Sequence, residues 1–152
     1  MKIFDKLNYL IFTFFYIGKL PASGTFASII TILIYVCIMF FFSNIIFLLI
    51  LVIITIYSLV FLKSILKKFD NKDPKEIVVD EYIGQSIPLL ICDNNIFLIL
   101  ISFISFRIFD IFKIFPANIF DKKIDGTIGI IGDDVIAGIY TIIIIYVVKT
   151  YI

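Results

Sequence analysis

The stretch FASIITILIYVCIMFFFSNIIFLLILVIITIYSLVFL, from Phe26 to Leu62, decides the fold, because none of its 37 residues is Asp, Glu, Lys or Arg. A helix needs about 20 apolar residues to cross the hydrocarbon core of a bilayer. The stretch is long enough for two such helices, and Ser43-Asn44 near its middle is typical of a tight turn. We therefore expect two spanning helices, over about residues 26–42 and 45–62.

The composition of the whole chain agrees with a lipid environment. Of its 152 residues, 62% are hydrophobic and 16% are charged, and the mean hydropathy is +1.15. A soluble domain has about a quarter charged residues and roughly half apolar ones. The net charge of +1 gives no reason to expect a nucleic-acid partner. At this length we expect a single domain over residues 1–152.

The N-terminal apolar segment, Leu7 to Ile17, is too short to cross a bilayer. It has the length of the apolar part of a signal peptide, with basic residues before it and small residues after it. We prefer an interfacial or re-entrant helix, because Asp5 interrupts the basic region and the chain beyond is itself apolar.

The rest of the chain alternates further apolar segments with polar ones. After the basic stretch Lys63–Lys75 we expect a short helix over about 76–91, bent near Pro88, and a turn at 92–95. Further helices are expected from Ile96 through Phe106 and from Val135 to Val148, separated by a polar segment over 115–133. The sequence thus predicts an all-α, polytopic membrane bundle of about four spanning helices plus the short N-terminal helix.

The distribution of lysines predicts the orientation of the bundle. Residues 63–75 include five Lys, whereas the turns at 43–44 and 92–95 have none. Because cytoplasmic loops are enriched in Lys and Arg, we place the basic stretch in the cytoplasm. By alternation, residues 18–25, 63–81 and 107–134 then all lie on the cytoplasmic side, and Lys149 lies on the other.

The residue types that are absent from the sequence exclude several kinds of catalytic site. The sequence has no His and a single Arg, Arg107, so a Ser-His-Asp triad, a phosphohistidine and an imidazole-held zinc are excluded. Cys37 and Cys92 have no CxxC spacing and are expected to be small hydrophobic residues. Catalysis would depend on carboxylates, Lys, Arg, hydroxyls and a hard metal ion.

Acidic residues gather in one half of the chain, since eleven of the twelve lie between positions 70 and 134. Charged groups at the ends of membrane helices are costly and usually functional. The predicted topology places the following groups at one membrane face: Asp80-Glu81 at a helix start, Arg107, Asp110 and Lys113 along one helix face, Asp121 and Asp125 in a loop, and Asp133-Asp134 at the start of the last helix.

Each group also has a purely structural interpretation. Acidic pairs at helix N-termini are favoured by the helix dipole, and Arg107 with Asp110 has the spacing of a helical salt bridge. Lys122 and Lys123 fit interfacial lysines, Gly126 and Gly129 fit loop glycines, and Thr25 fits an N-cap. The functional interpretation depends on the joint occurrence of these groups at one face.

Such a set suits a phosphorylated substrate and Mg²⁺. Magnesium binds carboxylates together with substrate phosphate and water, and Arg pairs with phosphate in a fork, to which Lys adds a point charge. Ser23-Gly24-Thr25, just before a helix, would offer N–H groups to an anion.

Four blocks of the sequence resemble the phosphatidylglycerophosphatase A family of bacterial membrane enzymes, in order and spacing over nearly the whole chain. They are Pro21–Ser28 (PASGTFAS), Ile77–Gly84 (IVVDEYIG), Phe106–Pro116 (FRIFDIFKIFP) and Asp121–Gly138, which includes GTIGIIGDDVIAG.

The resemblance implies a Mg²⁺-dependent phosphatase of the bacterial inner membrane. Its substrate would be the phospholipid phosphatidylglycerol phosphate, and its product phosphatidylglycerol, the precursor of cardiolipin. Its active site would face the cytoplasm. Carried over by position, the metal ligands and the general base would come from Asp80, Glu81, Asp110, Asp133 and Asp134. The phosphate would be bound by Arg107, Lys113, Gly24 and Thr25. Asp121 would support these residues without contacting the phosphate itself.

Three other classes of protein are alternatives. A CDP-alcohol phosphotransferase fits poorly, because Asp125-Gly126 is not followed by Ala-Arg and Asp133-Asp134 are adjacent. An ion-coupled transporter would keep its carboxylates near the bilayer midplane. An inactive membrane scaffold would share the fold without the activity.

Overall fold

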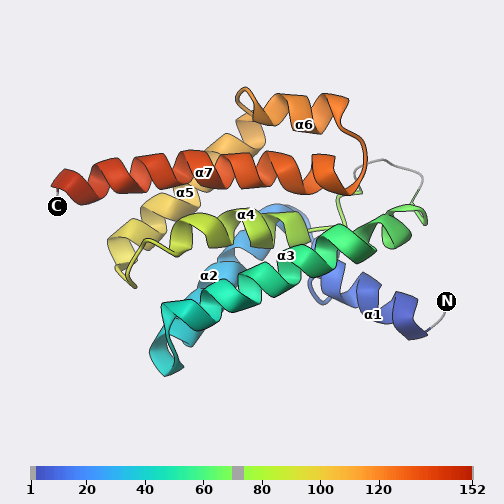
Figure 1. The fold of residues 1–152 in the computed structure, drawn as a ribbon, viewed down its shortest axis with the longest axis horizontal. Coiled ribbons are helices and arrows are strands. Elements are labelled where there is room, and N and C mark those ends of the chain that lie inside the picture. Colours follow the sequence, from blue (N-terminus) through green and yellow to red (C-terminus); the bar gives the residue numbers. More distant parts are fainter. Residues whose placement is uncertain (1–2, 70–73, 152) are drawn as a thin grey trace.

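The computed structural model describes residues 3–69 and 74–151, whose regular elements are all helices, with no strand among them. The all-α prediction is confirmed. In chain order the elements are α1 (Ile3–Phe12), the 3₁₀ turn η1 (Ile17–Lys19), α2 (Ser23–Phe41), α3 (Asn44–Leu66), α4 (Val79–Leu89), α5 (Ile96–Phe112), α6 (Ala117–Lys123) and α7 (Thr127–Tyr151) (Figure 1).

Within residues 3–69 and 74–151, three helices, α2, α3 and α7, are long and apolar enough to cross a membrane. Their 19, 23 and 25 residues correspond to lengths of roughly 28 to 38 Å at the rise of an α-helix. The tight turn predicted at Ser43-Asn44 is confirmed, since α2 ends at Phe41 and α3 begins at Asn44. Helix α5 is apolar but has only 17 residues, so the expected number of about four spans stays a prediction.

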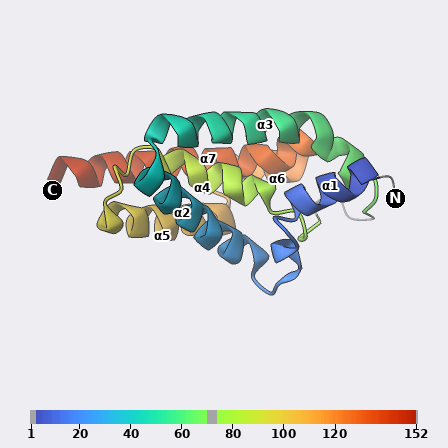
Figure 2. The ribbon, with the colours of Figure 1, turned by 90° about the horizontal axis from the view of Figure 1, so that it is seen from below.

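The short helix α4 lies at the centre of the bundle and packs against α7, α5, α2 and α3. Nine of its eleven residues are buried. Figure 2 shows α3 running along the bundle while α2 crosses it obliquely. A central helix surrounded by apolar ones can carry polar side chains into the interior, and α4 carries Asp80 and Glu81 in its first turn.

Two glycines set the distance between α4 and α7. A Cβ built on Gly138 would lie 2.6 Å from the backbone oxygen of Gly84, and one built on Gly84 would lie 2.7 Å from the backbone oxygen of Asp134. Small residues let membrane helices approach closely. The backbones therefore cross in direct contact, next to the acidic residues that both helices carry.

The two ends of the bundle differ in composition. At one end lie the α2–α3 turn, the α4–α5 turn and the end of α7 (Figure 1). These segments are joined there, because Asn44 donates to the carbonyl of Leu90 at 2.7 Å and Lys149 pairs with Asp93. The other end gathers α1, α6 and the start of α7. The described loops thus lie at two opposite ends of the bundle, as predicted. Which end faces the cytoplasm stays a prediction.

The last third of the chain differs from its prediction. Helix α7 begins at Thr127 rather than Val135, and residues 117–123 form α6 where a loop was expected. Gly129, interpreted as a loop glycine, is helical, and a Cβ there would lie 1.8 Å from the carbonyl oxygen of Ile124. Glycine here serves close packing against the chain before the helix, which a loop interpretation of the sequence misses.

Two other boundaries are also corrected. The helix expected over 76–91 covers only Val79–Leu89, with Pro88 in its last turn. Ser23, Gly24 and Thr25, expected just before a helix, form the first turn of α2. The short N-terminal helix is present as α1, with 10 residues, and its position at a membrane interface stays a prediction.

Candidate active site

A polar cavity of about 870 Å³ lies at the end of the bundle where α2 and α4 begin and α5 ends. It is lined by the 18–25 segment, by residues 75–77, and by the polar ends of α4, α5 and α7. Its lining contains nine of the ten predicted site residues: Gly24, Thr25, Asp80, Glu81, Arg107, Asp110, Lys113, Asp133 and Asp134. Residues far apart in the sequence thus meet in one cavity, as the family resemblance implies.

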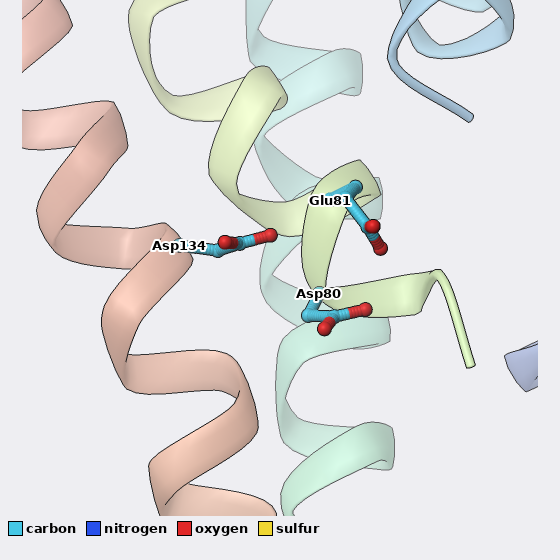
Figure 3. A group of neighbouring side chains, drawn as sticks. All are labelled: Asp80, Glu81 and Asp134. Carbon is cyan, nitrogen blue, oxygen red and sulfur yellow. The ribbon is translucent and has the colours of Figure 1, made fainter. Parts of the chain in front are cut away.

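Three of the five carboxylates form a tight cluster at the crossing of α4 and α7. Asp80, Glu81 and Asp134 each offer an oxygen within 4.8 Å of the others. Figure 3 shows Asp134 reaching from α7 toward the pair on α4. Asp80 and Asp134 are buried, and Asp134 Oδ2 and Glu81 Oε2 have no hydrogen-bond partner among the described residues.

Such a cluster fits a hard divalent cation. Three carboxylates this close repel one another unless they share protons or a cation. All the ligands offered are oxygens, which suits Mg²⁺, Ca²⁺ or Mn²⁺ and not a thiolate-selected metal.

Arg107 and Asp110 form a second group on α5. Their side chains are largely buried and join through Arg107 Nη1 and Asp110 Oδ2 at 2.5 Å, the salt bridge that the spacing predicted. Gly24 lies directly beside this group, since a Cβ built on it would stand 2.3 Å from Glu81 Oε1 and 3.0 Å from Arg107 Nη1. Glycine at this position lets the first turn of α2 approach the carboxylate and the guanidinium together.

Lys113 organises the third group. It caps the C-terminus of α5 with a left-handed backbone conformation (φ 44°), so it leaves the helix face on which it was expected. Its ammonium contacts Asp121 on α6 at 2.5 Å and Asp133 on α7 at 2.6 Å. Burial opposes its charge, but the hydrogen bonds to the two carboxylates outweigh this, so the pKa of Lys113 lies above its usual value.

The structure therefore divides the carboxylates that the sequence left undivided. Asp80, Glu81 and Asp134 form the cluster, Asp110 pairs with Arg107, and Asp133 pairs with Lys113. Asp133 and Asp134 lie inside α7 rather than at its start, so the helix dipole does not explain them. Asp121 lies in α6 rather than in a loop, outside the cavity lining, and reaches the site through Lys113.

Several residues of the site were not predicted. Gly84 and Gly138 set the helix crossing, and Lys19, Lys75 and Glu76 line the cavity. The glycines have a sequence signal, because a glycine inside a helix is costly and small residues let membrane helices approach closely. For Lys19 and Lys75 the only indication in the sequence is that each flanks a block that resembles the family.

Comparisons with known proteins identify the family of the chain. The model of the phosphatidylglycerophosphatase A family matches residues 10–149. The chain belongs to the phosphatidylglycerophosphatase A family. The resemblance noted in the sequence is thereby confirmed. No solved structure matches the chain.

Individual relatives match over shorter stretches. A phosphatidylglycerophosphatase A of Haemophilus influenzae is 40% identical over 78 residues, covering 51% of this chain and 48% of the relative. One of Escherichia coli is 37% identical over 49% of this chain and 44% of its own length. A Bacteroides thetaiotaomicron protein, named as a candidate phosphatidylinositol-3-phosphatase, is 39% identical over 52% of this chain and 51% of its own length. These matches span about half of each relative.

Proposed function

We propose that this member of the phosphatidylglycerophosphatase A family removes the terminal phosphate of phosphatidylglycerol phosphate to give phosphatidylglycerol. The observation that carries the proposal is the cavity in which Asp80, Glu81 and Asp134 meet Arg107 within an apolar helical bundle. A phospholipid fits this setting, because its chains would stay in the bilayer while its phosphate enters the polar cavity. We place the reaction at the cytoplasmic face of the bacterial inner membrane, on the lysine distribution described above.

In this proposal Asp80, Glu81 and Asp134 hold Mg²⁺. When bound, such an ion supplies Lewis-acid polarisation of the phosphoryl group and charge compensation for the cluster. The fit rests on the oxygen donor set and on the buried oxygens of Glu81 and Asp134 that have no partner among the described residues.

The remaining groups are placed to bind the phosphate and to position water. Arg107, oriented by Asp110, would pair with two phosphate oxygens. Lys113 would add a positive charge from the C-terminal end of α5, and the first turn of α2 at Gly24 and Thr25 would favour an anion. Asp133 would accept a hydrogen bond from the attacking water through Oδ1, which is buried without a partner among the described residues.

The transporter alternative predicts carboxylates near the bilayer midplane. In the structure Asp80 and Glu81 lie in the first turn of α4, and Asp134 lies eight residues into α7. Their common cavity lies at the end of the bundle where α4 begins and α5 ends, which favours chemistry on a lipid headgroup.

The test is phosphate release by the purified protein in mixed detergent micelles. We expect release from phosphatidylglycerol phosphate that requires Mg²⁺, is abolished by EDTA and falls at least a hundredfold in Asp80→Asn. Asp93→Asn is the matched control, because Asp93 lies at the other end of the bundle, paired with Lys149. Faster release from phosphatidylinositol 3-phosphate would favour the activity named for the Bacteroides relative, and no release from either lipid would favour a scaffold.

A further inference from the structure

The cavity has basic residues at two separate places. Arg107 and Lys113 lie beside the carboxylates, whereas Lys19 and Lys75 line the cavity from η1 and from the segment before α4. The 18–25 segment connects the two places, since Gly24 packs against Glu81 and Arg107 while Gly18 packs against the backbone of Glu76. Among the described residues, Lys19 and Lys75 have no carboxylate at ion-pair distance, unlike Lys113.

Lys19 and Lys75 lie on two segments that pack against each other and together form one rim of the cavity. A Cβ on Gly18 would lie 1.9 Å from the carbonyl oxygen of Glu76, and Ser23 donates to the carbonyl of Lys75 at 3.0 Å. The ammonium of Lys19 lies over the rings of Tyr9 and Tyr16, 5.6 and 5.2 Å from their centroids, an arrangement that orients a cation. These contacts join the segments that carry the lysines.

The charge at this rim matches a singly charged anion. Glu76 also lines the cavity and accepts a hydrogen bond from the Tyr9 hydroxyl. Two lysines and one glutamate leave one net positive charge. A phosphodiester carries one negative charge, whereas the phosphomonoester that is cleaved carries up to two.

The size of the cavity leaves room for a second group. Cavities of about 300–1,000 Å³ hold drug-sized ligands, and the volume here, about 870 Å³, far exceeds the need of one phosphate. Phosphatidylglycerol phosphate has both groups, a terminal phosphomonoester and, one glycerol away, a phosphodiester.

We infer that Lys19 and Lys75 form a subsite for the phosphodiester of the lipid substrate, separate from the groups that bind the phosphate to be removed. The inference rests on the proposed function. The rim would select lipids that carry a phosphodiester next to the phosphomonoester.

The test compares the Lys19→Gln/Lys75→Gln double variant with the wild type and with Lys123→Gln. Lys123 is exposed on α6 and lines no part of this cavity, so its variant controls for general attraction of anionic lipid. For phosphatidylglycerol phosphate we expect KM to rise about tenfold in the double variant, as for the loss of a charge-assisted hydrogen bond, with kcat within about threefold. The control should keep the wild-type KM, and an unchanged unfolding midpoint in detergent shows that the double variant is folded.

Two competitors separate the subsite from the cleavage site. Phosphatidylglycerol keeps the phosphodiester and lacks the phosphomonoester, so its inhibition constant should rise about tenfold in the double variant. Inorganic phosphate occupies only the cleavage site, so its inhibition should be equal in all three proteins. An unchanged KM, or equal weakening of both competitors, would overturn the subsite. A wild type that releases no phosphate from phosphatidylglycerol phosphate would instead contradict the proposed function.

Discussion

Gly138→Ala tests whether the helix crossing places the carboxylates. The new Cβ would stand 2.6 Å from the backbone oxygen of Gly84, and ordinary contact begins at 3.4 Å. The oxygen belongs to a helix backbone and cannot rotate away, so α4 and α7 must separate by about 0.8 Å. Asp134 would then move away from Asp80 and Glu81 by a similar amount. Because a misplacement of about 1 Å can cost roughly a hundredfold in rate, we expect kcat to fall about 30- to 100-fold.

The same substitution should change stability much less. Overpacking costs about 1–3 kcal/mol, but alanine is better than glycine in a helix by about 1 kcal/mol. The net loss in the free energy of unfolding is thus about 0–2 kcal/mol, and the variant should remain folded. A large loss of activity without unfolding would distinguish misplaced carboxylates from a damaged bundle.

The assay is phosphate release together with the unfolding midpoint in the same detergent. Gly84→Ala should give the same defect from the opposite helix, since its Cβ would lie 2.7 Å from the backbone oxygen of Asp134. Ile139→Ala, at a half-exposed position next to Gly138 on α7, should keep activity. A folded Gly138→Ala protein that keeps its rate within twofold would show that the helix crossing does not place the carboxylates.

Two further changes address charge. Lys113→Met removes the cation that joins Asp121 and Asp133, and the loss of its charge-assisted contact to phosphate should lower kcat/KM about 10- to 100-fold in the phosphate-release assay. Burial and the hydrogen bond to Glu76 raise the pKa of Tyr9 to about 12, so its hydroxyl stays protonated in the folded chain at pH values where the unfolded chain ionises. That stabilisation is complete below about pH 10 and is lost as the pH rises to about 12. The stability advantage over Tyr9→Phe in thermal unfolding should therefore shrink over this interval, and a constant difference would count against the assignment.

Much of the fold could be predicted because the signals are local. The uncharged stretch ending at Leu62 and the Ser43-Asn44 turn depend only on hydropathy and turn chemistry. The start of α7 could not be predicted this way, because Gly129 is helical for a reason that lies in the packing of Ile124. A glycine in a polar segment looks the same in sequence whether it bends a loop or admits a neighbouring backbone.

The candidate site shows the same division. Residue types and family spacing predicted that Asp80, Arg107 and Asp133 belong to one site. Their pairings depend on directions in space, such as the left-handed cap that turns Lys113 toward Asp133. The spacing of Arg107 and Asp110 along one helix predicted their salt bridge. Contacts between different helices leave no such spacing pattern in the sequence.

In the proposed function, carboxylates of α4 and α7 together form one cation site. Isothermal titration of the metal-free protein with Mg²⁺, without substrate, tests it most directly. We predict one ion per chain in the wild type and in Asp93→Asn, and at least a tenfold weaker affinity in Asp134→Asn. Unchanged Mg²⁺ affinity in a folded Asp134→Asn protein would contradict the claim.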